Sequence, residues 1–361
     1  MSERRERDVM SLVNRMGLLG ASLATLASSA GLYAVKTAGA PAHEIYQNED
    51  FDEILRLPRR IVTTEDGVPL VVRESGSALA RLTVVFVHGY CLRMQAWHMQ
   101  YRHLREQWGR DVRAVFYDQR GHGESGFSGA ATCTIAQLGR DLGRVIDEVA
   151  PTGPVVVVGH SMGGMTAIAL ASQRPDLFGE RIVGVGLLAT TAAGLSKTGI
   201  GRNLENPVID AFRYAARTAP GFVQFARGAA RAVVTPILRA ASYGTVVSPR
   251  LVKLSDRMLD ETSVLTIVNF LRTLELHDES AALPVLGTVP VLVLSGDADM
   301  VIPYASSEAL AEQLPDVELK RVRGAGHLVQ LEFPEVVDRA LDRLIQRSFT
   351  QGVNGRQIAI G

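Results

Sequence analysis

The stretch Val155-Val156-Val157-Val158-Gly159-His160-Ser161-Met162-Gly163-Gly164 decides the predicted fold. Four consecutive β-branched residues predict a strand that is buried on both faces, as in a parallel sheet. The small residues from Met162 to Arg174 predict a helix that ends before Pro175. Ser161 would therefore occupy a sharp turn between strand and helix, next to the positive N-terminus of the helix. Glycine suits positions 159 and 163 because the backbone of such a turn is strained and passes close to its neighbours.

The bulk composition is that of an ordinary globular protein. The chain has 361 residues and a formal net charge of zero, so it shows no electrostatic footprint for nucleic acid. Two cysteines, Cys91 and Cys133, are too few for a disulfide framework and do not decide the redox compartment. Zinc-ligand spacings and glycine-rich phosphate loops do not occur in the sequence, so no metal or nucleotide cofactor is predicted.

Residues 1–42 are predicted to form a separate N-terminal segment. Arginines in the first 15 residues precede residues 16–35, which carry no charge and are about as long as one bilayer crossing. Three interpretations fit this segment: a cleaved signal peptide ending at Ala40-Pro41-Ala42, an uncleaved membrane anchor, or a small-residue helix on a cytoplasmic protein. Because acidic residues follow the run, the positive-inside rule favours a folded domain outside the cytoplasm.

Strands and helices alternate on both sides of the central stretch. Predicted strands lie in the hairpin 61–73 and at 82–87, 112–117, 155–158, 182–188, 289–295 and 317–322, and helical patterns lie between them. The alternation stops over residues 190–284, which are predicted to form several helices. This order predicts an α/β fold with a mostly parallel, eight-stranded, doubly wound sheet and a helical cap between strands 6 and 7. Residues 55–189 and 285–347 would form the core, and residues 348–361 a loose tail.

Two loops near the C-terminus carry the groups that a reactive serine needs. A serine hydroxyl is a poor nucleophile until a base accepts its proton and a carboxylate orients that base. Asp297 and Asp299 follow one predicted strand, and His327 follows the next. Because such sheets place their ligands at the carboxyl ends of the strands, these side chains are expected to meet Ser161. From the residues alone, either aspartate could be the carboxylate.

Five motifs in order resemble the α/β-hydrolase superfamily over residues 55–347. They are His88-Gly89, Asp118-x-Arg120-Gly121-His122-Gly123-x-Ser125, the stretch around Ser161, Gly296-x-x-Asp299, and Gly326-His327 followed by Glu332-x-Pro334. The resemblance implies that Ser161 is the nucleophile, His327 the base and Asp299 the acid, since the family acid falls three residues after that glycine. It also assigns the oxyanion-hole amides to Tyr90 and Met162. It implies no metal or organic cofactor.

Other polar residues of these motifs are expected to have structural roles. Asp118 and Arg120 are predicted to form an ion pair that fixes their loop, and Cys91 to be a small buried filler. His88, His122 and His160 are predicted to shape loops through hydrogen bonds, whereas His98, His103 and His277 are expected on the surface or on helix faces.

The predicted function is hydrolysis of a small-molecule carboxylic ester with an apolar or lipid-like acyl group. The sequence Gly-His-Ser-Met-Gly-Gly also resembles monoacylglycerol lipases. Haloperoxidase, perhydrolase, C–C and amide hydrolase chemistry would use the same side chains, and a non-catalytic ligand-binding protein of this fold is a further alternative. Epoxide hydrolases and haloalkane dehalogenases use an aspartate nucleophile, so Ser161 disfavours both.

The cap has an unusual charge pattern. Residues 211–255 contain seven Lys or Arg residues and no Asp or Glu, interleaved with apolar side chains. Such a pattern predicts a helix that meets a membrane or lipid surface. The alternative is a solvated cap helix whose arginines pair with acids elsewhere in the chain.

Overall fold

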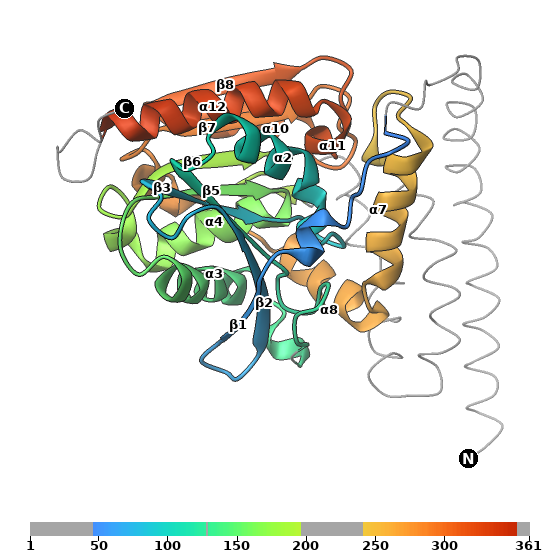
Figure 1. Cartoon of the computed structure of the whole chain (residues 1–361), viewed down its shortest axis with the longest axis horizontal. Coiled ribbons are helices and arrows are strands. Elements are labelled where there is room, and N and C mark those ends of the chain that lie inside the picture. The colour runs from blue at the N-terminus through green and yellow to red at the C-terminus, as the bar shows by residue number, and fades with distance from the viewer. Residues whose placement is uncertain (1–45, 128, 196–240, 352–361) are drawn as a thin grey trace.

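The computed structural model describes residues 46–127, 129–195 and 241–351, and within them the sheet has eight strands in the order β1-β2-β4-β3-β5-β6-β7-β8 (Figure 1). The strands are β1 (Arg59–Thr63), β2 (Pro69–Ser75), β3 (Leu82–Val87), β4 (Val112–Tyr117), β5 (Val155–His160), β6 (Ile182–Leu188), β7 (Val291–Gly296) and β8 (Val317–Val322). β2 runs antiparallel to β1 and β4, and the other neighbouring strands are parallel. The predicted mostly parallel, doubly wound sheet is confirmed.

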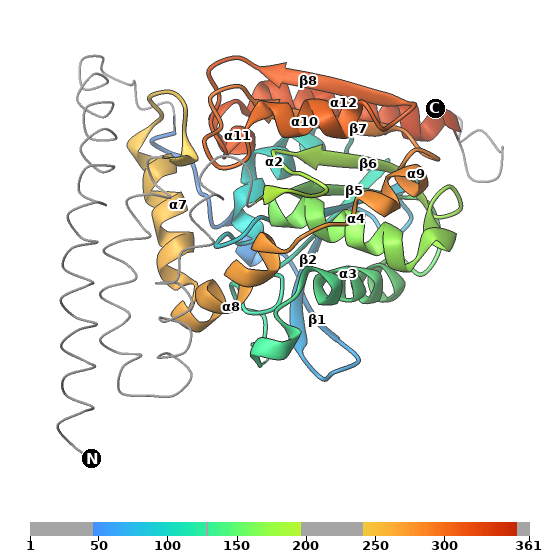
Figure 2. The same cartoon turned by 180° about the vertical axis from the view of Figure 1, so that it is seen from behind.

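Helices cover both faces of this sheet (Figures 1 and 2). One face carries α3 (Ile135–Val149), α4 (Met162–Gln173), α9 (Leu283–Leu286) and α10 (Tyr304–Ala311), and the other carries α2 (His98–Gln107) and α12 (Pro334–Gln351). In β5, Val155 and Val157 point into the first core, whereas Val156 and Val158 point into the second. This burial on both faces explains why four apolar residues follow one another in the sequence.

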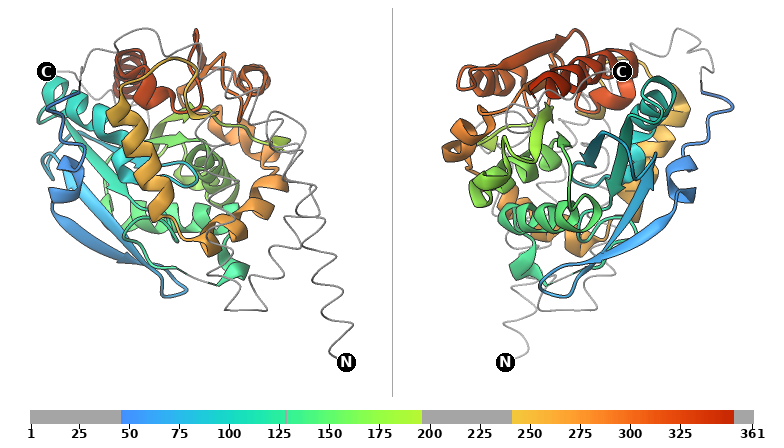
Figure 3. Two further views of the ribbon diagram at one scale, coloured as in Figure 1. Left: turned by 90° about the vertical axis from the view of Figure 1, so that its right-hand side faces the viewer. Right: turned by 60° about the vertical axis from the view of Figure 1, so that its left-hand side comes forward.

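Two cap helices lie beyond the carboxyl ends of the parallel strands, as the left panel of Figure 3 shows. They are α7 (Pro249–Glu261) and α8 (Val264–Glu275), and the side chains of Ser248 and Ser263 cap their N-termini. α7 packs its apolar side against the loop after β3 and against α11 (Val329–Glu332). The predicted helical insertion between strands 6 and 7 is therefore present.

Most of the basic stretch predicted to meet a lipid surface lies in residues 196–240, outside the described part of the chain. Arg250 of α7 is described, and its guanidinium donates hydrogen bonds to the backbone oxygens of Gln47 and Glu49. It also lies over the ring of Phe51, 5.9 Å from the ring centroid. The predicted segment 1–42 likewise lies outside the described residues. Among the helices that are described, none is long and apolar enough to span a membrane.

The last helix is longer than the sequence pattern predicts. α12 continues to Gln351, so the boundary of the predicted loose tail at residue 348 is wrong. Ser348 is buried, and its hydroxyl is satisfied by donating to the backbone oxygen of Leu344 at 2.8 Å. Phe349 is also buried and lies 5.9 Å from Trp108 between ring centroids. These contacts extend the helical core by one turn.

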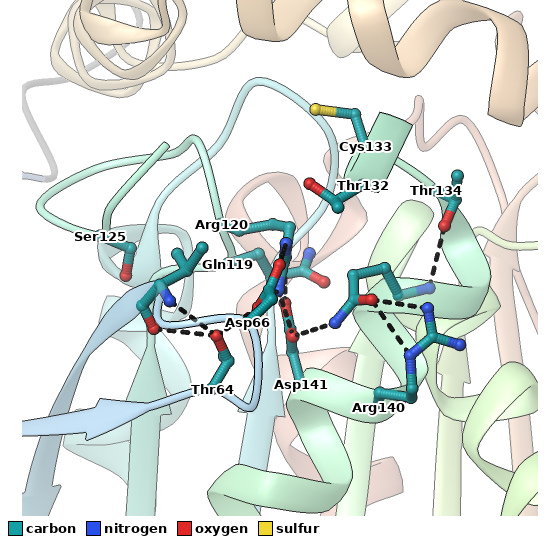
Figure 4. Close-up of polar contacts among 12 residues, drawn as sticks. Thr64, Asp66, Gln119, Arg120, Ser125, Thr132, Cys133, Thr134, Arg140 and Asp141 are labelled. Carbon is teal, nitrogen blue, oxygen red and sulfur yellow. Dashed lines mark hydrogen bonds and ion pairs between the residues drawn. The ribbon is translucent and has the colours of Figure 1, made fainter. Parts of the chain in front are cut away.

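The loop after β4 is held by ion pairs other than the predicted Asp118–Arg120 pair (Figure 4). The buried guanidinium of Arg120 contacts both oxygens of Asp66, at 2.8 and 2.9 Å, and both oxygens of Asp141, at 2.5 and 2.7 Å. Asp118 instead accepts the amide N–H groups of Met94 and Glu124. The predicted pair is wrong because backbone amides already occupy the Asp118 oxygens, and two other carboxylates satisfy Arg120.

Replacing Arg120 with Met should lower the free energy of unfolding by about 3–5 kcal/mol, because it leaves buried Asp141 without its cation. The control is Arg343→Met, which removes an exposed pair with Glu318 and should cost less than about 1 kcal/mol. Chemical denaturation of both variants measures the two losses. Equal losses would contradict a special structural role for the Arg120 cluster.

Candidate active site

Ser161 occupies a strained turn between β5 and α4. Its φ of 53° and ψ of −119° lie in a region that non-glycine residues rarely adopt. The turn is crowded: a Cβ atom at Gly159 would lie 2.3 Å from the backbone oxygen of Gly163, and one at Gly163 would lie 2.1 Å from that of Val87. The amide of Ser161 donates to the backbone oxygen of Leu188 at 2.9 Å. Close packing therefore requires both glycines and holds the serine in its strained conformation.

The structure brings Ser161, His327 and Asp299 together from three different loops. Ser161 Oγ lies 3.0 Å from His327 Nε2, and His327 Nδ1 lies 2.8 Å from Asp299 Oδ2. Because a carboxylate can only accept, Nδ1 carries the proton and Nε2 is free to accept the serine hydroxyl. The Asp299 side chain is fully buried. This arrangement can abstract a proton from the serine and stabilise the imidazolium that results.

The two candidate aspartates have different surroundings. Asp299 Oδ1 accepts the amides of Val301 and Ile302, at 2.8 and 2.9 Å, which leaves Oδ2 for His327. Asp297 binds the amide of Gly324 and the guanidinium of Arg321. Of the two aspartates, Asp299 is the one hydrogen-bonded to His327, as the family resemblance implied.

Three buried histidines hold the neighbouring loops in place, as predicted. His88 Nε2 accepts the amide of Gln119 at 2.9 Å, and His122 Nε2 accepts the amide of Cys91 at 3.2 Å. His160 Nε2 donates to the backbone oxygen of His327 at 2.9 Å. Burial is the main cause that lowers all three pKa values, to about 4 for His122, to about 3 for His160 and well below the usual range for His88. These imidazoles are therefore neutral and serve as fixed hydrogen-bonding groups.

The remaining histidines differ in part from expectation. His98 is fully buried, 2.7 Å from the carboxylate of Glu49, and His277 is buried with Nε2 donating to the backbone oxygen of Thr191. The expected surface position is wrong for both, because one ring nitrogen of each has a polar partner far along the chain. His98 does lie on a helix, as the first residue of α2, whereas His277 follows α8. His103 is partly exposed and contacts Asp342.

The loop after β3 passes directly over the serine. A Cβ atom at Gly89 would lie 2.7 Å from His160 Nδ1 and 3.1 Å from Ser161 Cβ, so only glycine fits there. The next residues are Tyr90 and Cys91, and Cys91 has a φ of 58°. Within the described residues, no acceptor takes the amide N–H of Tyr90 or of Met162. The oxyanion-hole role of these two amides stays a prediction.

Glu332 joins the loop of His327 to the chain that leads into α7. Its carboxylate accepts the amides of Gly326 at 2.7 Å, Gly244 at 3.0 Å and Thr245 at 2.6 Å. A Cβ atom at Gly244 would lie 2.1 Å from the backbone oxygen of Gly324, so the two backbones touch. The sequence motif included Glu332 but did not predict its contacts with Gly244 and Thr245, which lie 88 and 87 positions away in the chain.

A mostly apolar pocket lies between Ser161 and the cap. It is lined by Tyr90, Cys91, Leu92, His160, Ser161, Met165, Leu195, Ser242, Ser255, Asp256, Leu259, Leu274, Val301, Ile302, His327 and Leu328. Sequence reasoning missed the lining residues of α7 and α8, because an amphipathic helix does not reveal which apolar residue faces a ligand.

Cys91 and Cys133 are both free and buried. The described residues contain no group of three or more His, Cys, Asp or Glu side chains placed to hold a metal ion.

Comparison with known proteins identifies the family. A model described as "Alpha/beta hydrolase family" matches residues 84–340. The chain belongs to the α/β-hydrolase family. A monoacylglycerol lipase of Mycolicibacterium smegmatis is 25% identical over 265 residues, which cover 69% of this chain and 82% of that protein. The karrikin insensitive 2 receptor IA of Petunia hybrida is 24% identical over 272 residues, which cover 74% of this chain and 92% of the receptor.

Solved structures agree with this assignment. A thermophilic esterase from Thermogutta terrifontis matches this α/β hydrolase with a TM-score of 0.63 and 26% identity, covering 81% of this chain and 99% of the esterase. The family, its lipase relatives and this esterase together support hydrolysis of the esterase and lipase type.

Replacing His122 with Gln should flatten the pH dependence of stability in this α/β hydrolase. In the folded protein the imidazole stays neutral down to about pH 4, whereas the unfolded chain protonates it below its usual pKa of 6.5. The unfolded state binds the extra proton between these values, so stability falls as pH falls, by about 1.4 kcal/mol per pH unit for one histidine. The glutamine amide oxygen can accept the Cys91 N–H without titrating.

Chemical denaturation of both proteins from about pH 7 to about pH 4.5 measures this slope. Asp118 has the opposite effect on stability, because burial raises its pKa to about 6 and the folded state therefore binds the extra proton. Both proteins contain Asp118, so its contribution cancels in the difference between the two curves. Parallel curves would show that the pKa of His122 is the same in the folded and unfolded states.

Proposed function

We propose that the protein is a serine hydrolase that cleaves carboxylic esters with apolar or lipid-like acyl groups. The observation that carries the proposal is the continuous contact from Ser161 Oγ to His327 Nε2, at 3.0 Å, and from His327 Nδ1 to Asp299, at 2.8 Å. A base within hydrogen-bonding reach activates a serine, and a buried carboxylate keeps that base in the required tautomer.

In the proposed reaction, Ser161 Oγ attacks the ester carbonyl carbon while His327 Nε2 accepts the hydroxyl proton. The amides of Tyr90 and Met162 donate to the oxyanion that forms on the carbonyl oxygen. The imidazolium, held by Asp299, then gives its proton to the departing alcohol. Water attacks the acyl-enzyme with His327 again as the base, which releases the acid and restores Ser161.

The lining of the pocket supports an apolar acyl group. Met165 of α4, Leu274 of α8 and the neighbours Val301 and Ile302 present aliphatic side chains to the space beside Ser161. Burial of each methylene of an acyl chain against such a surface is worth about 0.8 kcal/mol. The similarity to a protein named monoacylglycerol lipase supports the same class of substrate.

A ligand-binding protein without turnover is the second candidate, favoured by the similarity to a protein named as a karrikin receptor. A fluorophosphonate probe separates the two candidates, because it labels only an activated serine. Absence of labelling in the wild-type protein would favour the binding protein.

Substitutions at the site test the proposed roles. Ser161→Ala should abolish labelling and ester hydrolysis, and Asp299→Asn should lower kcat by about 10⁴-fold, because the imidazole loses the partner that fixes its tautomer. Asp297→Asn is the matched control and should keep most of the activity, since Asp297 contacts Gly324 and Arg321 rather than His327. Steady-state hydrolysis of p-nitrophenyl esters measures these effects. An equal loss in the two aspartate variants would count against the assignment of Asp299.

Acyl-chain selectivity tests the proposed pocket. For p-nitrophenyl esters, kcat/KM should rise roughly fourfold per added methylene until the pocket is filled. Leu274→Trp fills part of the pocket and should lower the octanoyl-to-acetyl ratio of kcat/KM by about tenfold. Leu276→Trp places the same side chain at a position that is 62% exposed and absent from the lining, and should leave the ratio unchanged. If both variants alter the ratio alike, the acyl chain binds elsewhere.

A further inference from the structure

The cap holds the loop after β3 by a hydrogen bond to the side chain of Tyr90. Tyr90 Oη donates to the backbone oxygen of Ile267 in α8 at 2.6 Å, although 177 positions separate the two residues in the chain. An interior helix carbonyl also accepts the amide four residues later, so its own helix holds this acceptor in place. Its second lone pair is available to the phenol. Burial raises the pKa of Tyr90 well above its usual value, so the phenol stays a donor.

The same loop is fixed on either side of Tyr90. Gly89 packs against Ser161 and His160, where a Cβ atom would not fit. The amide of Cys91 donates to His122 Nε2 at 3.2 Å. The loop residues Tyr90 and Cys91 also form an apolar cluster with Ile267 of α8 and Leu259 of α7. Farther along the loop, Arg93 forms an ion pair with Glu261 of α7. At the residue that carries the oxyanion-hole amide, the phenol supplies the hydrogen bond to the cap.

We propose that Tyr90 is a positioning residue through which α8 orients one donor of the oxyanion hole. This inference rests on the proposed function, in which the amide of Tyr90 stabilises the oxyanion. An oxyanion-hole donor acts only when it lies about 2.7–3.1 Å from the developing charge. The bond from the phenol to Ile267 fixes the side chain of Tyr90. A fixed side chain limits rotation of the peptide between Gly89 and Tyr90, which carries this amide. The cap thereby contributes to the chemical step as well as to substrate binding.

The test compares Tyr90→Phe with Thr266→Val. The first variant keeps the ring and the backbone amide and removes the hydroxyl, which bonds to Ile267 of α8 and also contacts the side chain of the adjacent Cys91. The second removes a hydrogen bond from the adjacent residue of α8, because Thr266 Oγ1 donates to the backbone oxygen of Gly121 at 3.0 Å. Each variant therefore loses one contact between α8 and the core, but only Tyr90→Phe affects the oxyanion loop.

The measurements are kcat and KM for p-nitrophenyl butyrate, and the inhibition constants of a boronic acid and of butyrate. A boronic acid forms a tetrahedral adduct with the serine, whereas butyrate binds without one. Tyr90→Phe should lower kcat and weaken the boronic acid by about tenfold each, with KM and butyrate binding changed by less than about twofold. Thr266→Val should leave all four values within about twofold of wild type. Melting temperatures of both variants report any general loss of stability.

Equal effects of the two variants, or an unchanged kcat and boronic acid affinity in Tyr90→Phe, would overturn the positioning role while leaving the proposed function intact. A wild-type protein that neither hydrolyses the ester nor binds the boronic acid would overturn the proposed function, and this inference with it. The ratio of the two inhibition constants is a property of folded protein, so partial unfolding does not imitate the expected result.

Discussion

The candidate site depends on close backbone contact around Ser161. A residue held at a positive φ costs about 1–3 kcal/mol and persists only where its surroundings determine it. Here Gly159 and Gly163 let the turn fold against itself and against β3, and Gly89 lets the next loop lie on the serine. The flanking strand supplies the support, because β5 is hydrogen-bonded to β3 and β6 and buried on both faces. The position of the hydroxyl is therefore a property of the sheet rather than of a flexible loop.

Neutral imidazoles connect the loops that surround this turn. His160 links the end of β5 to the backbone of His327, and His88 links the loops after β3 and β4. His122 adds a second link between those two loops. A buried neutral imidazole offers one donor and one acceptor at fixed angles. His88 and His122 use both ring nitrogens and His160 uses Nε2, and none of the three introduces a charge next to His327.

Local sequence patterns were sufficient for the strands, the turn at Ser161 and the loops that carry Asp299 and His327, because those features depend on neighbours in the chain. The choice of Asp299 over Asp297 came from family resemblance, since the residue types alone do not separate them. Several predictions were wrong because they depend on partners distant in sequence. Arg120 pairs with Asp66 and Asp141, His98 with Glu49, and His277 with the backbone of Thr191. The predicted tail also begins too early, because Phe349 packs against Trp108. The cap residues that line the pocket have no local signature either. The catalytic roles assigned to the site residues stay predictions.

The contact of Glu332 with Gly244 and Thr245 restricts how this cap could evolve. A carboxylate of the core accepts amide protons from the inserted segment and from the loop of His327 at once, and Gly244 fits against Gly324 without room for a side chain. A cap grafted from a homologue would need a glycine and two free amides at the same junction to join this core without disturbing that loop. The insertion is thus a separate stretch of sequence but not an interchangeable module.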